Sequence, residues 1–228
     1  MNNYGSSWHE GVLFLSKQVQ NLASRLYRCH ETSEGREGVF RHYVTFVTHL
    51  SRVWERHSNV VSIELLNEPP AGGLWDLFCG RPSRLLRMRT DLFRFFAAAL
   101  EALAAAGVTR VPVGVGDIGQ SLPGASAATA FIACLDPLPH AVLATLRRWA
   151  AADRLMLAFH FYSPPCAVSF ERACELAHNF ANYLGDCPVY LSEFVEDEPV
   201  ATAQRIAQVR PAASRAPPPT PRQAPGDV

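Results

Sequence analysis

Apolar residues follow two different periods along this chain, and the change of period predicts where strands and helices lie. Four runs are short, apolar and bounded by turn residues, as buried strands are. They cover residues 60–66, 110–116, 155–161 and 188–192. Between them, apolar side chains recur every three or four positions, which predicts amphipathic helices over about 83–106, 140–151 and 169–184. Strands that alternate with helices are typical of βαβ units, so the pattern predicts an α/β fold with a parallel sheet.

Two further helices are predicted before the first strand. One covers about 12–27, with an apolar face formed by Leu15, Val19, Leu22 and Leu26. The other begins near Phe40 and carries apolar residues at helical spacing as far as Trp54. The polar residues 31–38 lie between these helices and predict a loop.

Glycine and proline mark several boundaries. Gly107 follows the long helix and is predicted to be the C′ residue that ends it. Pro112 falls within the second strand and weakens that prediction, because proline cannot donate a ladder hydrogen bond. From Pro211 onward the chain has six prolines and almost no large apolar side chains. Residues 211–228 are therefore predicted to be a disordered, Pro-rich tail.

Composition narrows the possible classes of protein. The 228 residues are 48% apolar, which is enough for one domain with its own core. The 21 basic and 21 acidic residues balance, and no basic block suggests a nucleic-acid partner. No run approaches the roughly 20 apolar residues of a transmembrane helix. The first residues lack the basic and apolar regions of a signal peptide, so the compartment stays open.

The six cysteines give little support for a metal or a redox motif, because they form no C-x-x-C pair. Cys174 and His178 lie four residues apart on a predicted helix, as two metal ligands would, but only Cys166 lies near them in sequence. Buried free thiols are common in proteins. No metal or cofactor is therefore predicted.

Polar side chains stand at the carboxyl ends of three predicted strands. Asn67 and Glu68 follow the first strand, His160 and Tyr162 end the third, and Glu193 follows the fourth. Parallel-sheet enzymes place their chemistry at this edge of the sheet. Two carboxylates suit glycoside hydrolysis, in which one protonates the leaving oxygen and the other stabilises or captures the developing oxocarbenium ion.

Three segments together resemble glycoside hydrolase family 5, the cellulase family. They are Asn67-Glu68-Pro69, His160-Phe161-Tyr162 and Leu191-Ser192-Glu193-Phe194, each after an apolar strand. The resemblance covers about residues 39–198, and the run 64–70 is similar to that of endoglycoceramidase-like members. It implies a retaining glycosidase on a (β/α)8, or TIM, barrel, in which these segments end strands four, six and seven.

The resemblance also implies a role for each matched residue. Glu68 would be the general acid/base, and Glu193 would be the nucleophile that forms a glycosyl-enzyme intermediate. Asn67 would hydrogen-bond the sugar 2-hydroxyl, while His160 and Tyr162 would hold Glu193 ionised and oriented. The substrate would be a β-linked oligosaccharide or glycolipid.

Each of these residues has a plainer interpretation when taken alone. A glutamate after an apolar strand is more often a charge at a helix N-terminus or on the surface, and His160 alone is more often structural. Trp75, in the loop after Glu68, would stack on sugar or, more often, anchor its own loop. Glu64 lies within a strand and is expected to form a salt bridge or face outward. The glycosidase prediction therefore depends on the joint occurrence of the three segments.

The chain departs from the family in length. A complete barrel has eight strands and about 250 residues, whereas only strands four to seven can be matched here. Residues 1–38 are predicted to form an unmatched N-terminal helix and loop, and residues 39–210 a partial glycosidase barrel that precedes the 211–228 tail. Strands one to three are expected to precede Met1, which makes the chain look like a fragment.

Two other classes of function stay open. A catalytically inactive remnant would keep the motifs without the pocket and act as a carbohydrate- or partner-binding protein. An unrelated α/β hydrolase has less support, because no G-x-S-x-G nucleophile elbow occurs in the chain. Gly114-Val115-Gly116 also lacks the third glycine of a dinucleotide-binding fingerprint.

Overall fold

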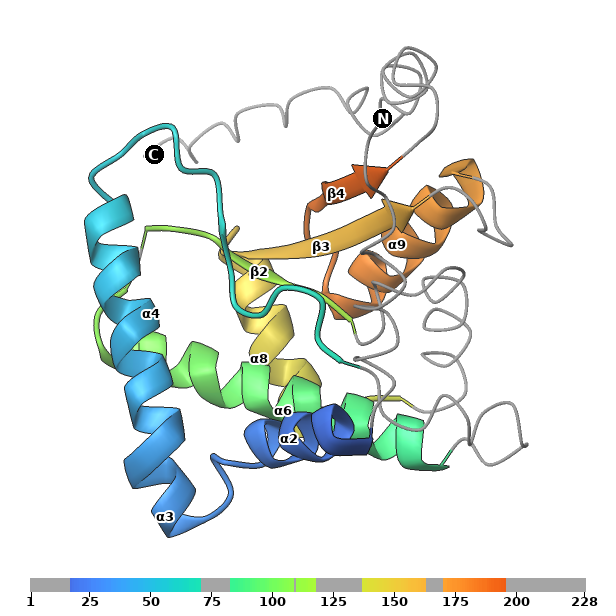
Figure 1. Cartoon of the computed structure of the whole chain (residues 1–228). Coiled ribbons are helices and arrows are strands. Elements are labelled where there is room, and N and C mark those ends of the chain that lie inside the picture. The colour runs from blue at the N-terminus through green and yellow to red at the C-terminus, as the bar shows by residue number, and fades with distance from the viewer. Residues whose placement is uncertain (1–16, 71–82, 109, 118–136, 163–169, 196–228) are drawn as a thin grey trace, which may run out of the picture. The chain divides into compact units, whose positions relative to one another are not determined.

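The computed structural model describes residues 17–70, 83–108, 110–117, 137–162 and 170–195, all within one compact unit. These residues form a mixed α/β structure around a four-stranded sheet (Figure 1). Its strands are β1 (Ile63–Glu64), β2 (Val113–Val115), β3 (Leu155–Tyr162) and β4 (Val189–Val195). All neighbours pair in parallel, and the order in the sheet is β1-β2-β3-β4. The predicted α/β class with a parallel sheet is confirmed.

Helices precede, connect and flank these strands. Before β1 lie α2 (Lys17–Tyr27), α3 (Ser33–Gly35), the π-helix η1 (Arg36–Phe40) and α4 (Arg41–Trp54). The three connecting helices are α6 (Ser83–Ala105), α8 (His140–Ala151) and α9 (Phe170–Leu184). Each of these three agrees within one residue with the helix that the sequence predicts.

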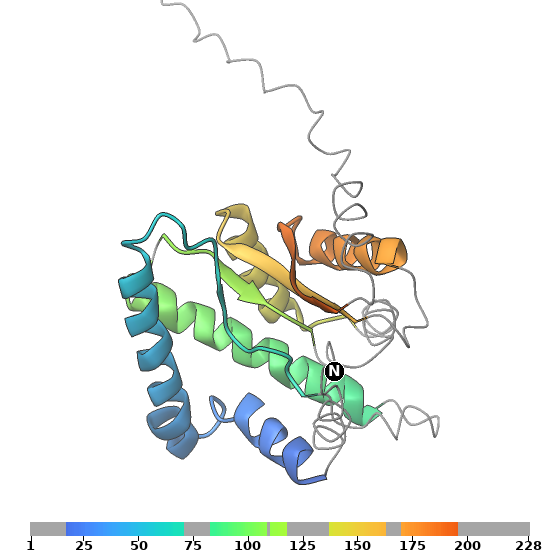
Figure 2. The same ribbon diagram turned by 45° about the horizontal axis from the view of Figure 1, so that its top comes forward.

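The connecting helices share one face of the sheet. Each links a strand to the next parallel strand in the same direction, and such crossovers are right-handed. Neighbouring helices contact each other in the order α6, α8, α9, and α8 and α9 also contact β3 (Figure 2). The apolar strand residues at alternate positions are buried in this layer: Ile63, Val113, Val115, Leu155 and Leu157. The main core therefore lies between the sheet and these helices.

The end of α6 shows how local sequence sets an element boundary. Gly107 adopts a left-handed backbone, with φ of 78°. Its amide donates to the carbonyl of Ala104, and the amide of Val108 donates to the carbonyl of Leu103. This pair of hydrogen bonds is the Schellman motif. The predicted C′ role of Gly107 is confirmed.

Three local predictions are wrong. Residues 31–38 are helical in large part, because the Thr32 hydroxyl accepts from the amide of Gly35 and caps α3. The first strand is limited to Ile63–Glu64, because the chain bends from Leu65 onward. On α2, the buried residues are Gln20, Ala23 and Tyr27, whereas Leu22 is 62% exposed. The apolar face predicted for this helix is therefore rotated by about one residue.

Candidate active site at the carboxyl ends of the strands

Two predicted site residues meet directly at the carboxyl edge of the sheet. Glu68 follows β1, and its Oε1 lies 2.9 Å from Nδ1 of His160 on β3. The His160 side chain is fully buried and that of Glu68 is 16% exposed. An ionised Glu68 accepts a hydrogen bond from an Nδ1–H group, which fixes the imidazole tautomer. Residues 92 positions apart in sequence are thus joined where the sequence predicts chemistry.

The segment that carries Glu68 has an unusual backbone and two side-chain anchors. Glu68 has φ of 43°, in the left-handed region that non-glycine residues rarely occupy. The phenol of Tyr43 on α4 donates to the carbonyl of Leu65 at 2.6 Å. The phenol of Tyr27, at the end of α2, donates to the carbonyl of Pro70 at 3.1 Å. The two N-terminal helices therefore contact the segment on both sides of Glu68.

A bulge in β4 sets the position of Glu193. Phe159 pairs with Leu191, but the next residue, His160, pairs with Glu193, so Ser192 is an extra residue in the ladder. The Ser192 hydroxyl donates to the carbonyl of Phe159 at 3.4 Å. Bulges often occur beside active sites, where they redirect a strand. Here the bulge brings the backbone of Glu193, rather than that of Ser192, opposite His160.

The structure describes fewer contacts for the other predicted site residues. Asn67 is exposed beside Glu68. Tyr162 ends β3, and its backbone pairs with that of Val195. Trp75 lies outside the described residues. The expected side-chain contact of His160 with Glu193 stays a prediction, because the Glu193 side chain lies outside the described part of the structure.

A buried ion pair at the end of β2 is absent from the sequence prediction. Asp117 lies two residues beyond β2, and its two oxygens accept from Nε of Arg89 on α6 at 3.2 and 3.0 Å. Both side chains are almost fully buried. The guanidinium also lies over the rings of Phe93 and Phe180, at 5.2 and 5.1 Å from their centroids. An Asp directly after Gly114-Val115-Gly116 was the available signal for a third acidic strand end.

A phenol and a carboxylate also meet across the sheet, on the side opposite the connecting helices. Tyr190 on β4 reaches past β3 and β2, and its hydroxyl donates to Oε2 of Glu64 on β1 at 3.5 Å. Burial, and then the charge of Glu64, raise the pKa of Tyr190 to about 12. Glu64 was expected to form a salt bridge or face outward. Among its contacts in the structure is this one with the phenol of Tyr190.

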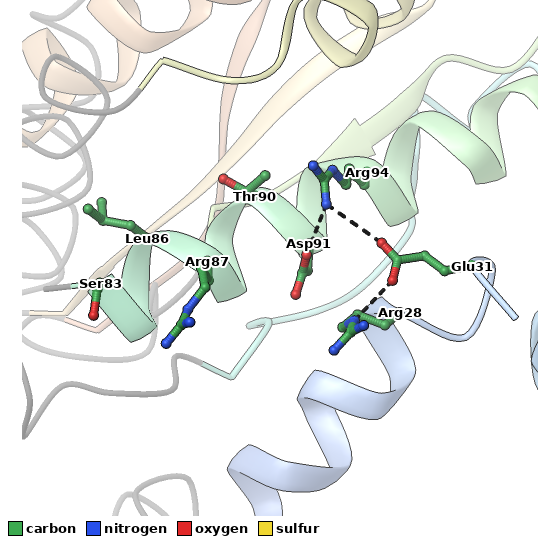
Figure 3. Close-up of a pocket in the computed structure, with 8 residues that line it drawn as sticks. All are labelled: Arg28, Glu31, Ser83, Leu86, Arg87, Thr90, Asp91 and Arg94. Carbon is green, nitrogen blue, oxygen red and sulfur yellow. Dashed lines mark hydrogen bonds and ion pairs between the residues drawn. The ribbon is translucent and has the colours of Figure 1, made fainter.

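A pocket of about 520 Å³ lies away from these strand ends, between α6 and the residues that follow α2 (Figure 3). Six of its lining residues come from α6, and Arg28 and Glu31 face them. Arg94 lies 3.7 Å from Glu31 and 3.6 Å from Asp91, and Arg28 pairs with Glu31 at 2.9 Å. Burial, and then Glu31, raise the pKa of Asp91. The lining carries three arginines, the third being Arg87, against two carboxylates, so most of its charge is neutralised within the pocket and one positive charge is left over.

The residues that could hold a metal do not assemble in the described part of the chain. There, no group of three or more His, Cys, Asp or Glu side chains lies together. Cys174 is a buried free thiol on α9. None of the described helices has both the length and the apolar character of a membrane span.

No protein-family model, curated protein or solved structure matches the chain.

Proposed function

We propose that this chain is part of a retaining glycoside hydrolase of the cellulase family, built on a partial (β/α)8 barrel. The order of the sheet supports this architecture. Strands that follow each other in sequence are neighbours in space, all are parallel, and a helix precedes each return to the sheet. Barrels of this class repeat the same unit eight times and carry their chemistry at the carboxyl ends of the strands.

The observation that carries the proposal is the convergence of three motifs on His160. Its ring contacts the carboxylate of Glu68, and its backbone is the parallel partner of Glu193. Glu193 therefore pairs through its backbone with the residue whose ring contacts Glu68, which supports a site that both glutamates share.

The proposed reaction has two steps. In the first, the Glu193 carboxylate attacks the anomeric carbon while Glu68 donates a proton to the glycosidic oxygen, so that the aglycone leaves and a glycosyl ester forms. In the second, Glu68 takes a proton from water, the water oxygen attacks the anomeric carbon, and the ester bond to Glu193 breaks. Two inversions leave the product with the configuration of a β-linked glycan or glycolipid substrate.

A mechanism-based inhibitor tests this proposal. A panel of 2-fluoro β-glycosides with good leaving groups should label the folded protein at Glu193, and peptide mass spectrometry should locate the ester. Glu193→Gln should abolish labelling, and Glu68→Gln should slow turnover of substrates with poor leaving groups by about 100-fold or more. Glu175→Gln, which changes a surface glutamate on α9, serves as the matched control and should leave both unchanged.

The same experiment distinguishes the alternative. Folded protein that shows neither labelling nor turnover across the panel would contradict the glycosidase. Retained binding of oligosaccharides by such protein would instead support an inactive carbohydrate-binding remnant. Labelling at a residue other than Glu193 would contradict the assigned nucleophile.

A further inference from the structure

Two tyrosines outside the three motifs bracket the segment that carries Glu68. Tyr43 donates to the carbonyl of Leu65, three residues before Glu68, and Tyr27 donates to that of Pro70, two residues after it. The phenols come from different helices, α4 and α2. Tyr27 also lies in the N-terminal region that the family resemblance does not cover.

The hydroxyl groups of Tyr27 and Tyr43 keep their protons and so remain hydrogen-bond donors. Tyr27 is fully buried and Tyr43 is half-buried. Burial raises the pKa of each hydroxyl far above that of a free tyrosine. Tyr43 is further fixed by ring contact with Phe95 on α6, at 5.0 Å between centroids. The hydroxyl groups therefore sit on side chains with little freedom to move.

The bond from Tyr43 lies at the point where β1 stops. The amide of Leu65 still donates to the carbonyl of Gly114 on β2 at 3.0 Å, as in a parallel ladder. The Leu65 carbonyl accepts from the phenol, and the bend that contains Glu68 begins there. A left-handed backbone at a glutamate is disfavoured and persists only where its surroundings enforce it. Fixed carbonyls on both sides of the bend provide that constraint.

We propose that Tyr27 and Tyr43 are positioning residues that hold the segment Leu65–Pro70 so that the Glu68 carboxylate stays against His160. The catalytic part of this inference rests on the proposed function, in which Glu68 is the proton donor. The helices α2 and α4 thus supply a constraint on the acid/base that does not come from the sheet itself.

The contact can be tested without turnover, by NMR of the histidine ring nitrogens. His160 is assigned by the loss of its signals in His160→Asn, and Glu68→Ala, which removes the acceptor, gives the reference for the lost contact. In Tyr27→Phe and Tyr43→Phe, each of which keeps its aromatic ring, the His160 ¹⁵N shifts should move toward the Glu68→Ala values. Tyr183→Phe is the matched control. Tyr183 lies near the end of α9, and its hydroxyl accepts from the amide of Leu138, which precedes α8. This variant should cause no change. Unchanged His160 shifts in both folded variants would overturn the proposal.

The dependence of turnover on the leaving group tests the catalytic part. A displaced general acid affects substrates that need protonation and spares those that do not. Each Tyr→Phe variant should lower kcat/KM about tenfold for a phenyl glycoside and less than about twofold for a 2,4-dinitrophenyl glycoside. Equal loss on both substrates would overturn the positioning role in catalysis. An inactive wild-type protein would refute the proposed function, while the NMR result would still decide whether the phenols hold Glu68.

Discussion

Gly114 makes room for a polar contact between the two outer strands of the described sheet. Tyr190 extends over β3 and β2 to reach Glu64, and it passes Gly114 on the way. A Cβ atom at position 114 would lie 2.7 Å from the Tyr190 hydroxyl and 3.2 Å from Oγ of Ser62. The first distance is shorter than real Cβ contacts, so the Tyr190 hydroxyl would have to move to admit a larger residue at position 114.

Gly114→Ala should therefore destabilise the protein, by about 1–3 kcal/mol for an overpacked site. Urea denaturation measures the change in the free energy of unfolding. Tyr190→Phe removes the oxygen in the clash, so most of the loss should disappear when Gly114→Ala is made in that background. An additive double-mutant cycle would show that the phenol does not occupy the space above Gly114.

The raised pKa of Tyr190 makes stability depend on pH in a defined direction. The folded phenol ionises near pH 12, whereas an unfolded tyrosine ionises near pH 10. Between these values the folded state binds more protons than the unfolded state, so the free energy of unfolding falls as pH rises. Urea denaturation between pH 9 and 12 should show a shallower fall in Tyr190→Phe than in the wild type. Equal slopes in the two proteins would contradict the buried pairing with Glu64.

At the scale of elements, the helices could be predicted because their signals are local. The spacing of apolar residues along 83–106 and the glycine at 107 are enough to give both the face and the end of α6. Pro112 proved compatible with the sheet, because it immediately precedes β2 and contributes only its carbonyl, which accepts from Ile63. A missing amide costs nothing where the ladder does not use it.

The strands near the site were harder to predict because other parts of the chain define their ends. β1 stops where Tyr43, 22 residues earlier, binds the Leu65 carbonyl. The bulge at Ser192 depends on the register between β4 and β3, and no residue type in β4 predicts it. The buried face of α2 is likewise set by its contact with α6 and by the hydrogen bond of Tyr27 to Pro70. Periodicity within one segment cannot encode such distant partners.

In the candidate site, too, features with a local sequence signal could be predicted, whereas features that depend on a distant partner could not. Glu68 and His160 could be proposed from sequence because each stands at the end of a recognisable strand within a motif, and their side chains are in contact in the structure. Asp117 was missed because an aspartate after a glycine-rich strand has no motif of its own, and its partner Arg89 lies 28 residues earlier on α6. That arginine falls in a helix whose charged positions normally face solvent.

At the scale of the whole molecule, the four described strands form a sheet with two edges. In the described residues, β1 pairs only with β2, and β4 pairs only with β3. Unpaired edges are sites where a sheet frays or associates. Residues of β3 from Leu155 to His160 are nevertheless mostly buried, together with Cys187 just before β4. The unpaired edge favours local opening of β4 alone. The buried residues favour opening of β4 only when the whole fold unfolds.

We expect the β4 edge to open only on global unfolding, and Cys187 provides the probe. Its thiol is buried, and burial raises its pKa to about 11, so the folded protein presents almost no thiolate at pH 8. Pro188, next to it, accepts from the amide of Leu157 at 2.8 Å and ties this point to β3. Labelling of Cys187 by a thiol reagent, followed by peptide mass spectrometry, should be about 1,000-fold or more slower in the folded protein than in the unfolded chain.

The dependence of this labelling rate on urea tests the expectation further. The logarithm of the rate should rise with urea at the slope of equilibrium unfolding, because the same surface is exposed in both processes. A much shallower slope would mean that the edge opens by itself, and the four strands would then not behave as one cooperative sheet.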